Sequence, residues 1–475
     1  MKPHIAPDFT LRRPVNVRQL PALLERLGAA LAEQKVRHCQ WKGHWKSDRW
    51  TTGEGDIDLL IAPADFSAFA AVAHQIGYRP TCVAPHAEIP GVSSWYGYDR
   101  ELPGFLRLHV YTRLVIGVYW RTLHRLPLEE AALDELVPRA IFPSPRPEIE
   151  LILFVLRMTL RRSTIDLGPE PRWLPVSREE LAYLETQANP ERLHELLARH
   201  LPAVDRSLFD ECREALAEPT GWRRRAAARR ALARALAAGA RPATLTVTVR
   251  RAVAALRARV PTRSVGSRRL ASGGFLVAIV GADGAGKTTC TLALRKWLGA
   301  HFQTMHAHLG RPQRSLTTLL VGALRRILPL RTLDHLRHVC TARDRYRMAA
   351  RTARFALKGG IALCERYPGA EHDQLVGPRI RVNAGPNAGS LAHRLAALEE
   401  DYYRRIPSPD LRLILRVPPD VAVRRKTTEP ADYVRRRATA VWDAQWTGAN
   451  TRVIDAGQPL VDVVADLKGA LWLEL

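Results

Sequence analysis

The stretch that most constrains the fold is 281–289, which has the sequence Gly-Ala-Asp-Gly-Ala-Gly-Lys-Thr-Thr. A continuous apolar run, 275–280, precedes it, as expected for a buried strand of a parallel sheet. Residues 288–302 then space their apolar side chains as a helix does. A glycine-rich turn between a buried strand and a helix predicts an α/β fold here, with the turn at the end of a strand.

This turn has the properties of an anion-binding loop. Glycine lets the main chain bend tightly, and the helix start adds free N–H groups and the positive end of a dipole. The stretch fits G-x-x-x-x-G-K-[ST], the pattern of loops that bind nucleotide phosphates. Lys287 is expected to reach the β- and γ-phosphates of ATP or GTP, and the Thr288 hydroxyl to bind Mg²⁺. The residues predicted to bind the nucleotide are Gly281, Asp283, Gly284, Ala285, Gly286, Lys287, Thr288 and Thr289.

Further stretches follow the loop in the order in which thymidylate kinases carry theirs, and about 200 residues at the C-terminus resemble that family. They are residues 342–345 (Ala-Arg-Asp-Arg), 359–367 (ending Cys-Glu-Arg-Tyr), 411–426 and 453–457. The resemblance implies a P-loop domain with a parallel sheet and helices on both faces. It also implies transfer of the γ-phosphoryl group of ATP to a nucleoside monophosphate or to another phosphorylated or hydroxyl acceptor, a small molecule in each case.

The resemblance implies roles for single residues. The catalytic residues would be Lys287, Arg366, Arg425 and Arg424. Arg366 would clamp an acceptor phosphate, and Arg425, with Arg424, would cover the transferring group. The acceptor would contact Asp283, Arg345 and Arg366. Glu365 stands where the family has aspartate and would hold Mg²⁺ through water. The residues after Tyr367 do not match the family's nucleotide-holding segment, so the acceptor is left open.

The N-terminal part carries a second, shorter motif. Trp41-Lys42-Gly43 is followed by Asp56-Ile57-Asp58, and aspartates at i and i+2 of a strand share one face and can share a metal. This combination resembles the nucleotidyltransferase superfamily, which implies an α+β domain with Asp56 and Asp58 as metal ligands. Arg107 stands where that family often places a third carboxylate, with Asp99 as a possible substitute. The domain either works with two carboxylates or has become a binding module, and we prefer the second interpretation.

Composition and periodicity divide the chain of 475 residues into three parts. We predict a nucleotidyltransferase-like domain at 1–125, a helical, arginine-rich segment at 126–270 and the kinase-like domain at 271–475. Apolar alternation over 107–118 predicts one continuous arm of a hairpin. His301, His306 and His308 have neither a carboxylate nor a cysteine beside them in sequence, which favours a polar strand end over a metal site.

Charged residues make up 25% of the chain and hydrophobic residues 46%, as in soluble globular proteins. The six cysteines are scattered, no apolar run is long enough to span a membrane, and the first residues lack a secretion-signal core. These features predict a cytoplasmic protein without a transmembrane segment. They leave the oligomeric state open.

The net charge of the protein is +25, and the charged residues are unevenly distributed along the chain. Residues 219–270 hold fourteen arginines, and Asp283 is the only acidic residue between Pro219 and Leu333. Such a block suits a polyanion, although a solvated basic helix is the preferred interpretation. Two alternatives to a kinase therefore stay open. One is a nucleotide-binding scaffold that docks to a polyanion, and the other is a nucleotidyltransferase regulated by its P-loop domain.

Overall fold

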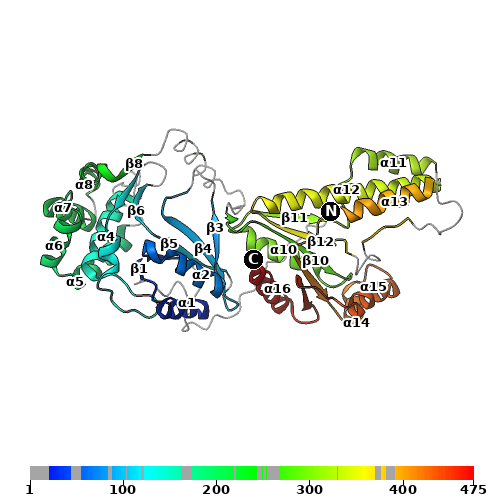
Figure 1. Ribbon diagram of the computed structural model, residues 1–475, viewed down its shortest axis with the longest axis horizontal. Coiled ribbons are helices and arrows are strands. Elements are labelled where there is room, and N and C mark those ends of the chain that lie inside the picture. The colour runs from blue at the N-terminus through cyan, green and yellow to red at the C-terminus, as the bar shows by residue number, and fades with distance from the viewer. Residues whose placement is uncertain are drawn as a thin grey trace. The chain divides into compact units, whose positions relative to one another are not determined.

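The computed structural model describes residues 21–43, 55–83, 88–102, 104–118, 122–161, 174–218, 221–242, 249, 253, 268–328, 330–369, 376–380 and 391–475. These residues belong to two compact units, one within Arg13–Arg263 and one within Ser264–Leu475. Both units contain helices and strands (Figure 1). The predicted mixture of α and β structure is therefore confirmed. Residues 44–54, which follow the Trp-Lys-Gly motif, fall outside the described residues. So do residues 243–248, which lie in the arginine-rich block.

In the N-terminal unit strands predominate up to Leu126 and helices predominate after it. Its strands are β1 (His38–Lys42), β2 (Asp56–Ile61), β3 (Arg79–Cys82), β4 (Val92–Tyr98), β5 (Phe105–Tyr111), β6 (Leu114–Val118), β7 (Thr122–Leu126) and β8 (Ala240–Pro242). Its helices are α1 (Ala22–Glu33), α2 (Phe66–Ile76), α3 (Glu129–Leu133), α4 (Pro147–Arg161), α5 (Leu174–Gln187), α6 (Pro190–His200), α7 (Arg206–Ala217) and α8 (Trp222–Ala235).

The first sheet of this unit has the strand order β1-β2-β5-β4-β3. Strands β2 and β5 are parallel, and the other neighbours in this series are antiparallel. The prediction of one arm over 107–118 is wrong, because β5 and β6 belong to different sheets and Thr112 and Arg113 form a bend between them. The apolar alternation continues across the bend, so the pattern does not reveal it.

Two apolar cores stabilise the N-terminal unit. Helices α1 and α2 cover the sheet, where Leu27 and Phe69 pack with Leu108. Helix α4 is almost entirely buried, because helices α5 to α8 and strand β6 surround it. The strongest apolar run of the sequence, 151–156, lies in this helix. A helix that is apolar over most of its surface is expected at the centre of a core.

The C-terminal unit alternates strands with helices. Its strands are β9 (Arg269–Leu270), β10 (Phe275–Gly281), β11 (Thr304–His308), β12 (Ile361–Glu365), β13 (Leu411–Arg416) and β14 (Thr451–Asp455). Its helices are α10 (Lys287–Gly299), α11 (Leu316–Ile327), α12 (Arg331–Leu357), α13 (Leu391–Arg404), α14 (Pro419–Arg425), α15 (Ala431–Asp443) and α16 (Leu460–Glu474).

Five strands of this unit form a fully parallel sheet in the order β11-β12-β10-β13-β14. Helices α10 and α16 pack together on one face, and α12 contacts the strands from the other (Figure 1). The central strand β10 is apolar and buried from Leu276 onward because both faces are covered. Its carboxyl end, where ligands of such sheets bind, leads directly into the glycine-rich loop.

Candidate functional site

The glycine-rich loop connects β10 to α10 in a conformation that requires its glycines. Gly284 and Gly286 have φ angles of 87° and 81°, in the left-handed region that favours glycine. A Cβ atom at Gly284 would lie 2.5 Å from the carbonyl oxygen of Ala422. Gly286 is the N-cap of α10, so the helix begins at Lys287. The loop thus presents free backbone N–H groups at a positive helix end, as an anion site needs.

Lys287 is buried at the base of this loop. Its ammonium group donates a hydrogen bond of 2.6 Å to the carbonyl of Ala282 and lies 3.9 Å from Oδ1 of Asp283. Burial and the nearby guanidinium of Arg366 lower the pKa of Lys287 to about 8, although Asp283 acts in the opposite direction. The amine of Lys287 is therefore protonated at neutral pH, and a bound anion would stabilise this protonated form.

Asp283 gathers two further cations at the loop. Its carboxylate forms an ion pair with Arg366, which follows β12, and Oδ2 lies 3.1 Å from Nε of Arg437 in α15. Burial alone would raise the pKa of Asp283, but Arg366, Lys287 and Arg437 together lower it. One carboxylate thus faces three cations, and the cluster keeps an excess of positive charge.

Arg366 owes its position to an unusual backbone. Its φ angle is 53°, a left-handed value that non-glycine residues rarely adopt. Its N–H donates to the carbonyl of Ile279 at 3.2 Å, which ties it to the central strand. A Cβ atom at Gly310 would lie 2.6 Å from Cδ of Arg366, so this glycine makes room for the arginine stem. Such strain often occurs at functional sites.

Thr288 and Glu365 bring two oxygen donors together beside the loop. The Thr288 hydroxyl donates a hydrogen bond of 3.0 Å to Oε2 of Glu365, and Nε2 of His306 lies 3.0 Å from Oε1. Burial would raise the pKa of Glu365, but these two hydrogen bonds and the nearby imidazoles of His306 and His308 outweigh it, so the pKa is lowered. His306, which has no carboxylate beside it in the sequence, thus contacts the carboxylate of Glu365 in the structure.

The contacts of three other arginines that the sequence singles out are with residues outside this cluster. Arg425 donates to the carbonyl of Ala456 at 2.7 Å, and Arg424 is exposed at the end of α14. Arg345 is buried, donates to the carbonyl of Leu309 at 2.7 Å and forms a hydrogen bond with the Tyr403 hydroxyl. The sequence pattern does not identify Arg437 or His306 as a residue of this site. Only their positions in the fold distinguish them from other arginines and histidines.

The N-terminal unit brings its two sequence-selected aspartates together as expected from their spacing. Asp56 and Asp58 lie beside Arg107 and His109 of the neighbouring strand β5. Arg107 pairs with Asp56 at 2.7 Å, and Lys42 pairs with Oδ1 of Asp58 at 2.9 Å. Both carboxylates therefore have cationic partners. The part of the chain that the structure describes holds no group of three or more His, Cys, Asp or Glu residues that could hold a metal.

The alternative third acid, Asp99, serves a different purpose. Its two carboxylate oxygens accept hydrogen bonds of 3.1 Å from the backbone N–H groups of Leu23 and Glu101. The first of these N–H groups lies in the opening turn of α1, where backbone donors lack helical partners. Asp99 thus caps a helix.

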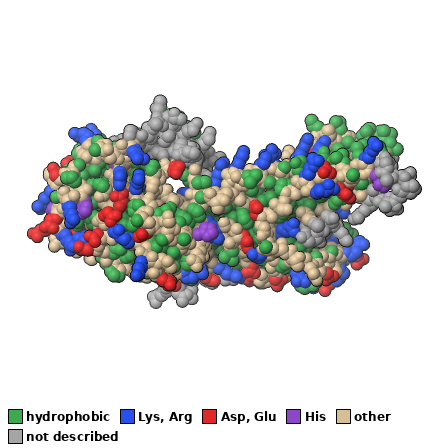
Figure 2. Space-filling view, in the orientation of Figure 1, with side chains coloured by type: hydrophobic (Ala, Val, Ile, Leu, Met, Phe, Trp, Pro, Cys, Tyr) green, Lys and Arg blue, Asp and Glu red, His purple; other side chains and the backbone are tan. Residues whose placement is uncertain are grey.

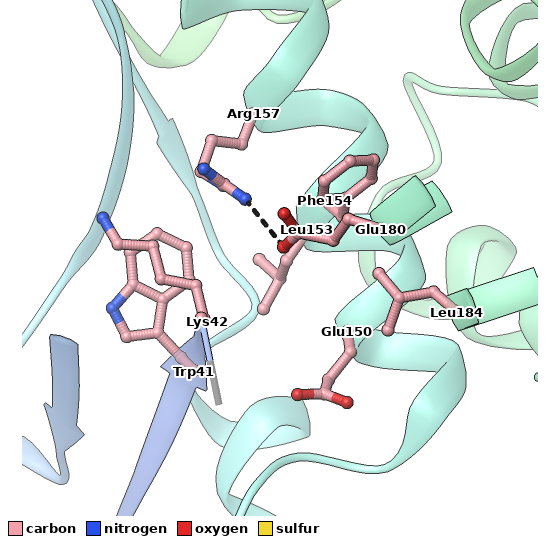
Figure 3. Close-up of a pocket in the computed structure, with 9 residues that line it drawn as sticks. Trp41, Lys42, Glu150, Leu153, Phe154, Arg157, Glu180 and Leu184 are labelled. Atoms are coloured by element: carbon pink, nitrogen blue, oxygen red, sulfur yellow. Dashed lines mark ion pairs between the residues drawn. The ribbon is translucent and has the colours of Figure 1, made fainter. Parts of the chain in front are cut away.

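Lys42 lies at the edge of a small pocket between β1 and helices α4 and α5 (Figure 3). Burial lowers the pKa of Lys42, with Asp58 opposing this effect, whereas Lys42 and His109 together outweigh burial and lower the pKa of Asp58 to about 2. Across the pocket, Arg157 lies 3.7 Å from Glu180. The two cations that line the pocket, Lys42 and Arg157, therefore both have carboxylate partners within the protein. Its lining residues are Trp41, Lys42, Gly43, Glu150, Leu153, Phe154, Arg157, Glu180 and Leu184.

Part of the arginine-rich stretch 219–270 lies in α8, and two of its arginines have partners within the protein. Arg224 pairs with Glu214, and the buried Arg225 donates to the carbonyl of Glu218 at 3.0 Å. No helix within the described residues has both the length and the apolar character needed to cross a bilayer. All six cysteines are in described segments, and none of them forms a disulfide.

No model of a known protein family matches this chain, and no curated protein matches it either.

Proposed function

We propose that the C-terminal unit is an ATP-dependent phosphotransferase of the thymidylate kinase type. It transfers the γ-phosphoryl group of ATP to a nucleoside monophosphate or to another phosphorylated or hydroxyl acceptor. The observation that carries the proposal is the hydrogen bond between Thr288 and Glu365, next to the buried ammonium group of Lys287. A hydroxyl at a helix start, a strand-end carboxylate and a lysine are the parts that P-loop enzymes need around ATP and Mg²⁺.

The loop residues bind the nucleotide in this proposal. The backbone N–H groups around Gly284 and Gly286 cradle phosphate oxygens. Glycine at 284 also lets the loop pass close to α14, where a Cβ atom would clash with the carbonyl oxygen of Ala422. Lys287 contributes the cation for the β- and γ-phosphates. Its lowered pKa fits this role, because a bound phosphate stabilises the protonated amine.

The oxygen donors of Thr288 and Glu365 fit Mg²⁺. This ion prefers oxygen ligands and is commonly held by one or two protein groups together with phosphates and water. When bound, it would neutralise charge on the phosphate oxygens. His306 holds the second oxygen of Glu365 and thereby fixes the direction of the carboxylate.

Positive charge for the transferred group comes from Arg366 and Arg437. Both guanidinium groups converge on Asp283 from different elements, so they are positioned before any phosphate arrives. Pre-positioned cations stabilise the charge that develops during phosphoryl transfer. Arg345 serves as a positioning residue on the acceptor side, since it supports the turn at Leu309 and contacts Tyr403. Arg425, with Arg424 beside it on α14, is proposed to cover the transferring group and to stabilise its developing charge.

Release of ADP tests the proposal. The full chain is incubated with ATP, Mg²⁺ and a panel of nucleoside monophosphates and phosphorylated sugars. Acceptor-dependent ADP release is expected in the wild type and is lost in Lys287→Ala. Lys296→Ala is the matched control, because Lys296 is exposed on the same helix. Full activity of Lys287→Ala, or no acceptor-dependent release by the wild type, would refute the proposal.

Nucleotidyl transfer by the N-terminal unit is a second, separate proposal. It is supported by the convergence of Asp56 and Asp58 with His109, which lies 3.5 Å from Oδ1 of Asp58. The pairing of Asp56 with Arg107 argues for a binding module instead. Pyrophosphate release that disappears in Asp56→Ala but persists in Lys287→Ala would assign the chemistry to this unit.

A further inference from the structure

Helix α11 presents its apolar side to solvent. Leu316, Leu320 and Ile327 are 79%, 69% and 75% exposed, and their spacing of four and seven residues places them on one face. The neighbouring exposed apolar residues are Leu319, Leu324, Leu328 and Leu330. Hydrophobic side chains gather over α11 in the space-filling view (Figure 2).

The polar side of the same helix faces the protein. Thr318 is buried and donates a hydrogen bond of 2.5 Å to Oδ2 of Asp344 in α12. Arg325 pairs with Asp334, also in α12. A helix on the surface of a globular protein normally buries its apolar face. Helix α11 is therefore held in the reversed orientation by polar contacts, and its apolar stripe is available to a partner.

The surroundings of the stripe are basic. Arg311, Arg314, Arg326 and Arg331 are exposed in and around α11, and residues 284–333 contain no acidic side chain. Two copies of this face would bring arginines together, which is electrostatically unfavourable. An apolar stripe flanked by cations instead matches an anionic lipid surface, which offers acyl chains and phosphate groups at the same interface.

We propose that α11, together with Leu328 and Leu330, docks the protein on an anionic membrane surface. The leucines enter the boundary between headgroups and acyl chains, and the arginines contact lipid phosphates. The helix has 12 residues, so it lies in the interface and does not cross the bilayer. This inference does not depend on the proposed phosphotransferase activity.

Vesicle sedimentation of the full chain tests the proposal. Binding is expected to phosphatidylcholine vesicles that contain phosphatidylglycerol, and weaker binding to phosphatidylcholine alone. The triple variant Leu316→Ser, Leu320→Ser, Ile327→Ser should bind about 100-fold more weakly, since three apolar side chains no longer enter the lipid. Arg326→Gln should bind about fivefold more weakly. Leu357→Ser is the control, because Leu357 is 83% exposed at the other end of α12 and should leave binding unchanged.

Hydrogen exchange distinguishes this docking from attraction to the arginine block at 219–270. With anionic vesicles, protection of residues 316–330 is expected in the wild type and in Leu357→Ser, but not in the triple variant. The proposal is overturned if the triple variant sediments like the wild type, if 316–330 gain no protection, or if no vesicles bind. A dimer of the wild type that the triple variant loses, without lipid binding, would assign the stripe to a second copy and overturn it as well.

Discussion

Nε of Arg437 lies 3.1 Å from Oδ2 of Asp283, so an arginine of α15 reaches the glycine-rich loop. The same carboxylate pairs with Arg366, which comes from the end of β12. Asp283 thus holds together two guanidinium groups that distant parts of the chain supply. Both cations are therefore in position before a phosphate group binds. Phosphoryl transfer requires cations that are positioned in this way to stabilise the charge on the transferred group.

Replacing Arg437 should therefore impair the proposed reaction. We expect Arg437→Ala to lower kcat by about 100-fold, because one donor to the developing charge is lost. Acceptor-dependent ADP release measures the effect. Arg436→Ala is the control, because Arg436 is the neighbouring residue in α15 and is exposed. The kcat of this variant should stay within about twofold of the wild-type value. Equal losses in both variants would exclude a specific role for Arg437.

The pKa of Lys287 predicts how ATP binding depends on pH. It is about 8 without ligand, and a bound phosphate should raise it. Below pH 8 the amine is protonated in both states, so affinity is constant. Above pH 8 binding requires uptake of a proton, and affinity falls by as much as about tenfold per pH unit. Calorimetry at pH 7 and pH 9, in buffers with different ionisation enthalpies, measures both the affinity and the proton.

Lys287→Arg supplies the control for this titration. A guanidinium group stays protonated over this range, so any nucleotide that the variant still binds should show no proton uptake and little dependence on pH between 7 and 9. A wild-type affinity that is unchanged at pH 9 would contradict the assignment of the titration to Lys287.

Part of the C-terminal fold could be predicted from the sequence because it depends on local patterns. The apolar run 275–280 and the glycines at 284 and 286 identify a strand, a tight loop and a helix start, which the structure contains. The spacing of Asp56 and Asp58 likewise places both on one strand face. In each case the backbone geometry of a short segment is sufficient.

Other features could not be predicted because they depend on contacts between distant segments. Nothing in the sequence around Arg437 or His306 distinguishes these residues from solvated side chains, and only the packing of α15 and β11 brings them to Asp283 and Glu365. In helix α11 the local pattern is clear but does not reveal which side of the helix is buried. Its apolar residues have helical periodicity, yet they are exposed because Thr318 on the other side binds Asp344.

Asp344 should be important for the stability of the C-terminal unit. It accepts hydrogen bonds from the backbone N–H of Ser315 and the hydroxyl of Thr318, and these contacts outweigh burial and lower its pKa. Asp344→Ala should cost about 2–3 kcal/mol, because buried donors lose their acceptor. Asp334→Ala, also in α12 but at a partly exposed ion pair with Arg325, should cost less than about 1 kcal/mol. Hydrogen exchange of the α12 amides measures both.

The stabilisation by Asp344 should also depend on pH. Because its folded pKa lies below the unfolded value of about 3.9, the contribution is complete above that pH and is lost as the pH falls through the folded pKa. The difference in exchange between wild type and Asp344→Ala should accordingly shrink in acid. A difference that is constant down to the folded pKa and below it would show that the carboxylate charge is not responsible.

The ion pair of Lys42 and Asp58 should behave as a buried pair in the N-terminal unit. The pair is 2.9 Å long, with side chains 22% and 12% exposed. Lys42→Met should lower the free energy of unfolding by about 3 kcal/mol, because it leaves a buried carboxylate without its main partner. Lys42→Met combined with Asp58→Asn should be less destabilising than the sum of the two changes, because neither charge is then left alone.

A double-mutant cycle measured by hydrogen exchange of the β2 amides gives the coupling energy, expected at about 2 kcal/mol. The pair of Arg37 and Glu130 is the matched control. It has the same length of 2.9 Å, but its side chains are 53% and 72% exposed, so its coupling should stay below about 1 kcal/mol. If the two cycles gave the same coupling, burial would not strengthen the Lys42–Asp58 pair. Lys42 would then be available to bind an external anion at little cost to the fold.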